Sequence, residues 1–182
     1  MKTSKRILHE GRFLRLAEIE GISPSGLSFT WEIVERVNAK GIVVIVPVRE
    51  TSLGRFFIFV RHWRAPLQAW VMEFPAGLND KDESLEETAI RELREETGYL
   101  AKRLIHLGTF PASSGISSER LDCYLATELV QTGKVELEPL EELEVMEIPF
   151  EEAMDFLQKA KSSGDFVDLK VYGLIELAKN RL

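Results

Sequence analysis

The spacing of apolar and polar residues predicts a chain that alternates between strands and helices. Residues 41–48 are a continuous apolar run, which is typical of a central strand buried on both faces. Residues 29–36 alternate instead, so Phe29, Trp31 and Ile33 are expected on one face of a strand. The same reasoning predicts further strands at residues 13–19, 55–60, 70–74, 104–110, 121–127 and 145–149.

Three other stretches have the period of a helix. Ser84 is a good N-cap residue, Glu87 completes a capping box with it, and Gly98 is placed to end the helix. Residues 150–161 and 168–181 are also amphipathic. Strands interspersed with helices predict an α/β fold with a mixed sheet between helices. In the last helix the expected core residues are Leu169, Tyr172, Ile175, Leu177 and Ala178.

The first 38 residues show only short strand patterns, with a turn signal at residues 23–26. A small antiparallel sheet has little core of its own, so the main domain or a second subunit must cover it. We therefore divide the chain into N-terminal strands at residues 1–38 and a main domain at residues 39–182.

The first candidate functional site is a pair of carboxylates on the inward side of the helix at residues 84–98. On a helical wheel, Glu92 and Glu96 lie on the same side as the apolar residues Leu85 and Ala89. Like charges four residues apart repel, and an ionised carboxylate removed from water is costly unless it is paired. A divalent cation would offset this cost, and hard oxygen ligands suit magnesium or manganese. The alternative is an ordinary solvated acidic face.

The other polar residues of this helix are expected away from the carboxylate pair. Glu87, Arg91 and Arg94 fall on the solvent side of the wheel, and Glu95 lies at its flank. No cation of the helix is therefore expected beside Glu92.

The composition narrows the class of protein. The chain of 182 residues has a net charge of −7 and no block of Lys and Arg, which argues against nucleic acid as the main partner. Cys123 is the only cysteine, so we expect no disulfide framework, and its place on an apolar strand face predicts a core residue. No apolar run is long enough to span a bilayer, and none follows the basic start as a signal-peptide core. We expect a soluble cytoplasmic protein that does not bind membranes.

Residues 77–99 contain a spaced motif, G-x5-E-x7-R-E-L-x-E-E-x-G followed by Tyr99. This stretch resembles the Nudix box of the Nudix hydrolases at every fixed position, and the match weakens the solvated-face alternative. Tyr99 is a departure, because the family more often has an aliphatic residue there. The resemblance implies a Nudix α/β/α sandwich with a mixed sheet, in addition to the small N-terminal antiparallel sheet. The matching residues are Gly77, Glu83, Arg91, Glu92, Leu93, Glu95, Glu96 and Gly98.

The flanks of the motif are similar to those of the ADP-ribose and nucleoside-diphosphate-sugar pyrophosphatases. His62-Trp-Arg64 followed by Glu73-Phe-Pro-Ala-Gly77 is similar to the "QYR … ElPAG" flank of that subfamily. Residues 114–119 resemble its "SPGxSxE" loop, with Ser114 in place of proline and one Ser doubled. Residues 29–36 match its N-terminal strand.

The resemblance implies magnesium-dependent hydrolysis of nucleoside diphosphate sugars, such as ADP-ribose, ADP-glucose or GDP-mannose, to a nucleoside monophosphate and a sugar phosphate. Manganese is a possible substitute for magnesium. The resemblance also implies a homodimer that exchanges the strands at residues 1–38. One alternative is a Nudix hydrolase of another nucleoside diphosphate derivative. The other is a non-catalytic protein that binds ADP-ribose-like ligands, which would usually have lost carboxylates that this motif retains.

Residue roles follow from the resemblance in the same way. Metal binding is implied for Glu92, Glu95, Glu96 and the carbonyl of Ala76. Glu119 is the implied general base, and the catalytic group also includes Glu95 and Arg91. Substrate binding is implied for Trp31, Arg36, Arg64 and Glu73, with Trp31 stacking on the base of the nucleotide. Gly77, Glu83 and Gly98 would shape the motif, with Arg91 pairing with Glu83 or Glu95.

Three of these roles have plainer alternatives. The alternative for Arg64 is an ordinary surface arginine at the end of a strand. Trp31 on an alternating strand is more often a core or interface residue than a stacking platform. The alternative for Glu119 is a residue that only caps a turn.

Overall fold

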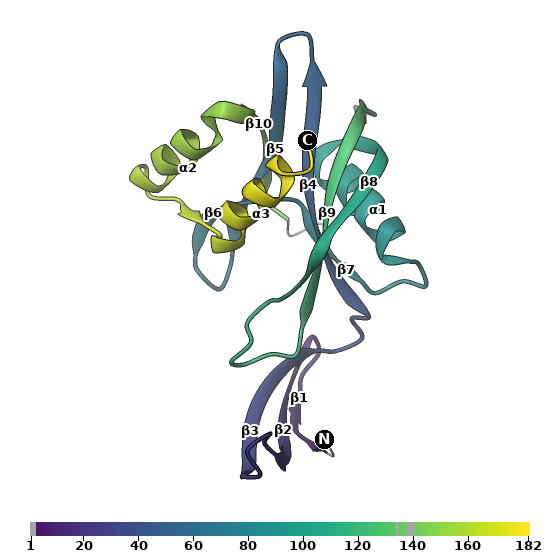
Figure 1. Ribbon diagram of the computed structural model, residues 1–182, viewed down its shortest axis with the longest axis vertical. Helices are drawn as coiled ribbons and strands as arrows, with labels where there is room; N and C mark the ends of the chain where they lie inside the picture. Colours follow the sequence, from purple (N-terminus) through teal and green to yellow (C-terminus); the bar gives the residue numbers. More distant parts are fainter. Residues whose placement is uncertain (1–2, 134, 138–140) are drawn as a thin grey trace.

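The structure, a computed structural model, describes residues 3–133, 135–137 and 141–182. Its N-terminal strands form an antiparallel sheet that projects from one end of the molecule (Figure 1). The strand order is β1 (Ser4–Glu10), β2 (Leu14–Ile22) and β3 (Ser28–Arg36). The small antiparallel sheet expected from the sequence is therefore confirmed.

The apolar residues of β3 are not buried together. Ile33 is buried, Phe29 is half-buried and Trp31 is 54% exposed. The three residues share one face of β3, as predicted, but the described chain covers this face only in part, since burial falls from Ile33 to Trp31. The remainder of the sheet is open to solvent or to another molecule.

The main sheet is built around β4 (Gly41–Thr51), whose residues 43–48 are all buried, as predicted. This strand pairs in parallel with β9 (Arg120–Gln131) and antiparallel with β5 (Gly54–Arg64) and β7 (Ala76–Asn79), which makes the sheet mixed. In the described ranges the order is β11-β6-β5-β4-β9-β8, with β10 paired to β5. The other strands are β6 (Ala69–Glu73), β8 (Tyr99–Pro111), β10 (Leu143–Pro149) and β11 (Phe166–Val167).

Helices cover both faces of the main sheet (Figure 1). The helix α1 (Leu85–Thr97) lies on one face, while α2 (Ala153–Ser162) and α3 (Leu169–Lys179) lie on the other. A 3-10 turn at Phe150–Glu152 leads into α2. Within the described ranges, no helix has the length and apolar character needed to cross a membrane. The arrangement is the expected α/β/α sandwich.

Alternate residues of β4 contribute to two hydrophobic cores. Val44 and Val46 pack in the core beneath α2 and α3, which includes Leu157 and Ile175. On the opposite face, Val43 and Ile45 pack with the α1 residues Ala89 and Leu93. Cys123 belongs to the first core, as predicted.

One expected core residue of the last helix is not in the core. Leu169 is 83% exposed, because it opens α3 directly after the N-cap Asp168, before the helix reaches the sheet. Ile175 and Ala178 are buried as expected, and Tyr172 and Leu177 are half-buried.

Candidate active site

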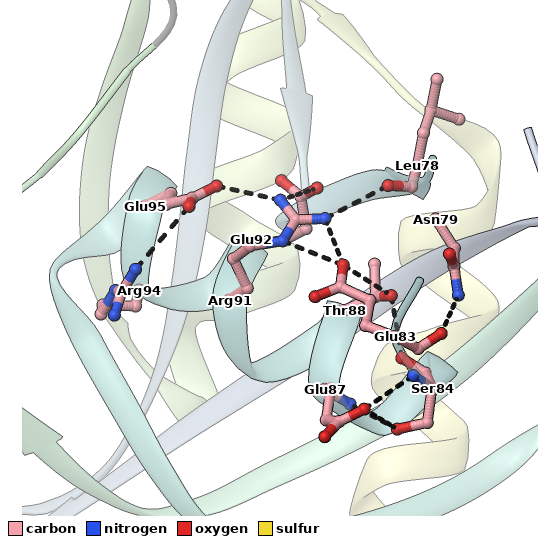
Figure 2. Close-up of polar contacts among 10 residues, drawn as sticks. All are labelled: Leu78, Asn79, Glu83, Ser84, Glu87, Thr88, Arg91, Glu92, Arg94 and Glu95. Carbon is pink, nitrogen blue, oxygen red and sulfur yellow. Dashed lines mark hydrogen bonds and ion pairs between the residues drawn. The ribbon is translucent and has the colours of Figure 1, made fainter. Parts of the chain in front are cut away.

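The ends of α1 are fixed by the two caps that the sequence predicts. The Ser84 hydroxyl accepts a hydrogen bond from the Glu87 amide at 3.2 Å, and the Glu87 carboxylate accepts one from the Ser84 amide at 2.7 Å (Figure 2). Gly98 ends the helix with φ of 71°, a left-handed conformation in which glycine is favoured. The helix is therefore held in register with the loop that precedes it.

Arg91 joins that loop to the helix (Figure 2). Its Nη2 donates to Glu83 at 2.7 Å, and its Nη1 donates to Glu92 at 2.7 Å and to Glu95 at 3.0 Å. A further bond reaches the carbonyl of Leu78 at 3.3 Å. The predicted solvent position of Arg91 is wrong, since its side chain is only 15% exposed. Its long side chain turns back along the helix because three carboxylates surround the guanidinium.

Glu96 is the most deeply buried carboxylate of the motif. The residue is 4% exposed, and its Oε2 has no hydrogen-bond partner among the described residues. Burial, reinforced by the negative charges of Glu92 and Glu141, raises the pKa of Glu96 well above its ordinary value. Burial also raises the pKa of Glu92, although Arg91 opposes this shift. The inward pair expected from the helical wheel is present. The expectation that no cation of the helix lies beside Glu92 is wrong, because Arg91 pairs with it, and the orphan oxygen is that of Glu96.

Gly77 is required by the close approach of Glu92. A Cβ atom at this position would lie 1.9 Å from the Cδ of Glu92, so no side chain fits unless the carboxylate moves. The neighbouring Ala76 hydrogen-bonds to Glu96 through its backbone. The strand β7 therefore supports both inward carboxylates of α1.

The chemistry of these residues fits a hard divalent cation. Glu92, Glu95, Glu96 and the carbonyl of Ala76 offer only oxygen donors, and one buried Glu96 oxygen lacks a partner. Within the part of the chain that is described, no three acidic, His or Cys side chains converge as a ready cage. Arg91 accounts for this, because it already binds Glu92 and Glu95. Magnesium needs no full cage, since it commonly uses one or two carboxylates, water and substrate phosphates.

Arg64 and Glu73 form a forked pair beside this site. The Nε of Arg64 donates to Glu73 at 2.9 Å, and its Nη2 donates at 2.5 Å. Glu73 is buried, and the pairing raises the pKa of Arg64. The positive charge of Arg64 also favours the ionised form of Glu96 and so opposes the upward shift of its pKa. The structure thus brings the flank residues Arg64 and Glu73 together near the carboxylates of α1.

Glu119 lies in a different setting. Its carboxylate pairs with Arg36 at 3.3 Å, and both line a cavity of about 940 Å³ between the N-terminal sheet and the main domain. Lys40 and Arg120 add positive charge to this cavity. Trp31 donates from its indole Nε1 to the carbonyl of Gly115 at 2.9 Å. Glu119 and Arg36 therefore meet at one hollow. Its described lining does not include Trp31, Arg64, Glu73 or the carboxylates of α1.

The sequence pattern does not single out Glu141 among the acidic residues at 135–144. The negative charge of Glu141 adds to the upward pKa shift that burial gives Glu92 and Glu96, which places it close to the carboxylates of α1. It lies in the acidic stretch at residues 135–144, of which residues 138–140 are outside the described ranges. The density of acidic residues there was the available signal, but the pattern alone indicates a solvated surface.

Comparison with known proteins identifies the class. Residues 39–169 match the NUDIX domain. The chain therefore belongs to the Nudix hydrolase family, and it is an enzyme of the pyrophosphohydrolase class.

Two curated relatives and one solved structure illustrate the similarity. The chain is 35% identical over 156 residues to the ADP-ribose pyrophosphatase of Bacillus subtilis (strain 168), covering 85% of this chain and 81% of that protein. It is 36% identical over 102 residues to the ADP-sugar pyrophosphatase of Mus musculus, covering 53% and 47%. The crystal structure of an ADP compounds hydrolase matches with a TM-score of 0.79 and 23% identity, over 98% of this chain and 91% of that one. The last similarity shows a shared fold.

Proposed function

We propose that this protein hydrolyses the diphosphate of nucleoside diphosphate sugars, ADP-ribose being the first substrate to test. The products would be a nucleoside monophosphate and a sugar phosphate, and magnesium would be the metal, with manganese as a substitute. The buried pair Glu92 and Glu96, with its orphan oxygen, is the observation that carries the proposal. The names of the two curated relatives support this choice of substrate class.

A bound divalent cation would neutralise diphosphate oxygens and polarise phosphorus. The residues of the chain have further tasks besides holding that ion. Arg91 fixes the carboxylates through its contacts to Glu83, Glu92 and Glu95. Arg64, oriented by its fork to Glu73, is placed to bind a phosphate or the terminal sugar.

A general base must take a proton from the attacking water within hydrogen-bond reach. We assign this role to Glu119, which faces the cavity and is paired with Arg36. Glu141 is the competing carboxylate, because its charge acts on both Glu92 and Glu96. Trp31 keeps the proposed role of stacking on the base of the nucleotide.

A substrate panel tests the activity. The purified protein is treated with a chelator, reloaded with magnesium or manganese, and given ADP-ribose, ADP-glucose, GDP-mannose and UDP-glucose in parallel. We expect release of the nucleoside monophosphate from at least one sugar nucleotide, only with metal. Turnover of an oxidised nucleotide or a dinucleoside polyphosphate in preference to all four would support another Nudix substrate. Tight binding without product would support a non-catalytic ligand-binding protein.

We further propose that the active form is a homodimer. The projecting N-terminal sheet leaves several large apolar side chains uncovered in one chain, and grouped exposed apolar residues often mark an interface. A second subunit would cover them and bring its strands toward the partner's substrate site. The exposed residues on the strands and turns of the sheet are Ile7, Leu8, Phe13, Leu14, Ile22, Leu27 and Trp31. The cytoplasmic location expected from the sequence stays a prediction.

A further inference from the structure

The loop at residues 112–119, between β8 and β9, is attached to β3 of the N-terminal sheet (Figure 1). The indole Nε1 of Trp31 donates to the carbonyl of Gly115 at 2.9 Å. The amide of Val34 donates to the carbonyl of Ile116 at 2.8 Å. These two bonds tie the middle of the loop to the middle of the strand.

Two side-chain contacts continue the attachment toward the main domain. The Ser118 hydroxyl donates to the carboxylate of Glu35 at 3.1 Å, and Glu119 pairs with Arg36 at 3.3 Å. Glu35 is itself held by Lys5 of β1 at 2.5 Å. We call the four contacts between β3 and the loop the latch. Its residues follow in the same order along the strand and along the loop.

The loop has little else to hold it in place. Its internal bonds form a turn, in which the Ile116 and Ser117 amides donate to the Ser113 carbonyl at 3.1 and 2.9 Å. Most of its side chains are exposed, so apolar burial contributes little to its position. The internal turn gives the loop a shape, whereas the latch gives it an orientation.

The latch also forms one wall of the cavity of about 940 Å³. Glu35 and Arg36 line this cavity from β3, and Ser118 and Glu119 line it from the loop. A change in the angle between strand and loop would move both sets of side chains apart. The shape of the cavity therefore depends on a contact between the N-terminal sheet and the main domain of the same chain.

We propose that Trp31 and Glu35 are positioning residues, which hold the loop at residues 112–119 against β3 and so fix the wall of the substrate cavity. The proposal rests on the proposed function only in taking this cavity as the site of the nucleotide sugar. Trp31 acts here through its indole N–H on the loop of its own chain. This action is separable from stacking, which needs only the ring.

Trp31→Phe tests the latch because it keeps an aromatic ring and removes the donor. We measure hydrogen exchange of the Val34 amide, which donates to Ile116 across the latch, together with kcat and KM for ADP-ribose in the full-length, metal-loaded enzyme. Loosening the latch by one hydrogen bond should speed exchange at this amide about three- to tenfold and raise KM by a similar factor. Trp31→Ala should give the same exchange as Trp31→Phe. If stacking alone matters, Trp31→Phe should resemble the wild type in both measurements.

Glu35 offers a matched pair of variants. Glu35→Gln keeps an oxygen acceptor for Ser118, whereas Glu35→Ala removes it. We expect the Gln variant to keep slow exchange at the Val34 amide and the Ala variant to lose it. Ser25→Ala, at the tip of the hairpin between β2 and β3, is the control and should leave exchange and KM unchanged.

Unchanged exchange in Trp31→Phe and Glu35→Ala would overturn the latch. Faster exchange with wild-type kcat and KM would overturn its role in substrate binding. If the wild-type enzyme hydrolyses none of the sugar nucleotides, the proposed function fails instead, and exchange still decides whether β3 holds the loop.

Discussion

At the scale of single residues, Glu96 sets the chemistry of the site. Its Oε2 is buried without a hydrogen-bond partner among the described residues, although burial of an unpaired acceptor is destabilising. Natural proteins keep such an atom when a ligand satisfies it. Substitution of Glu96 is therefore the most direct test of the proposed metal site.

Glu96→Gln should keep the size of the side chain and remove the charge that a cation needs. Turnover with magnesium should fall by orders of magnitude, while the metal-free variant should be at least as stable as the wild type, because a neutral amide is cheaper to bury. Steady-state kinetics and thermal unfolding with chelator or magnesium measure both effects. Glu86→Gln, on the exposed first turn of α1, is the control. Near-normal turnover of Glu96→Gln at saturating magnesium would refute the metal assignment.

The two candidate bases can be compared directly. General-base catalysis contributes about 10²–10⁴-fold, so Glu119→Gln should lower kcat by a factor in this range while substrate and metal still bind. Glu141→Gln should have a smaller effect on kcat. The reverse result would transfer the role to Glu141, which acts electrostatically on the carboxylates of α1.

At the scale of elements, Arg91 decides whether the loop before α1 and the helix behave as one unit. Removing it leaves Glu83, Glu92 and Glu95 without their shared cation. Arg91→Gln should lower the free energy of unfolding by about 3 kcal/mol in chelator, as breaking a buried ion pair commonly does. Urea unfolding measures this change. Arg94→Gln, whose exposed side chain makes one long contact to Glu95, should change it by less than about 0.5 kcal/mol. Equal losses of unfolding free energy in both variants would show that Arg91 does not hold the loop and α1 together.

Local sequence patterns predict the elements well where they act within one helix or strand. Ser84, Glu87 and Gly98 fix the ends of α1 as expected, and the apolar run in β4 is buried as expected. The Nudix motif likewise points to the inward pair Glu92 and Glu96. These features need only neighbours in sequence or a fixed period.

The features that sequence analysis missed depend on contacts between distant elements. A helical wheel places Arg91 in solvent because it ignores the length of the side chain and Glu83 in the preceding loop. The pattern of β3 predicts the face on which Trp31 lies, but it predicts neither the exposure of the side chain nor its hydrogen bond to Gly115 in a distant loop. Glu141 acts electrostatically on Glu92 and Glu96, which are more than 40 residues away in sequence, and no local period reveals such a distant contact.

At the scale of the whole molecule, buried ionisable groups should limit stability at alkaline pH. Burial raises the pKa of Tyr99, Cys123 and Tyr124 to about 12 each. In the unfolded chain these groups lose their protons at about pH 8.5–10. The folded state therefore keeps protons that the unfolded state has lost. The contribution of these three groups to stability is constant below about pH 8.5 and declines toward pH 12.

Urea unfolding at pH 7.5 and pH 11 measures this decline. Cys123→Ala is the matched control, because it removes the first of the three groups to titrate and should make the decline shallower. The Cys123 thiol of the folded wild type should also resist alkylation at pH 8.5. Equal free energies of unfolding at the two pH values would contradict the prediction.

The assembly is tested by removing residues 1–38. The full-length protein should be a dimer at micromolar concentration by light scattering, because its N-terminal sheet exposes apolar side chains. The truncated protein should become monomeric or aggregate, and should lose binding of sugar nucleotides with its Nudix motif intact. A monomeric full-length protein would refute the dimer and leave Trp31 with its contact to Gly115 alone.

The parallel pairing of β4 with β9 has a consequence for recombining this enzyme with its relatives. Ile42 lies opposite Leu121, so the two strands begin at the same edge of the sheet. The segments that precede them, β3 and the loop at residues 112–119, must therefore leave that edge side by side. The two segments contact each other although Glu35 and Ser118 are 83 residues apart in sequence, so they should be exchanged together. A chimera that takes residues 1–38 from another Nudix enzyme should be built with that enzyme's loop as well.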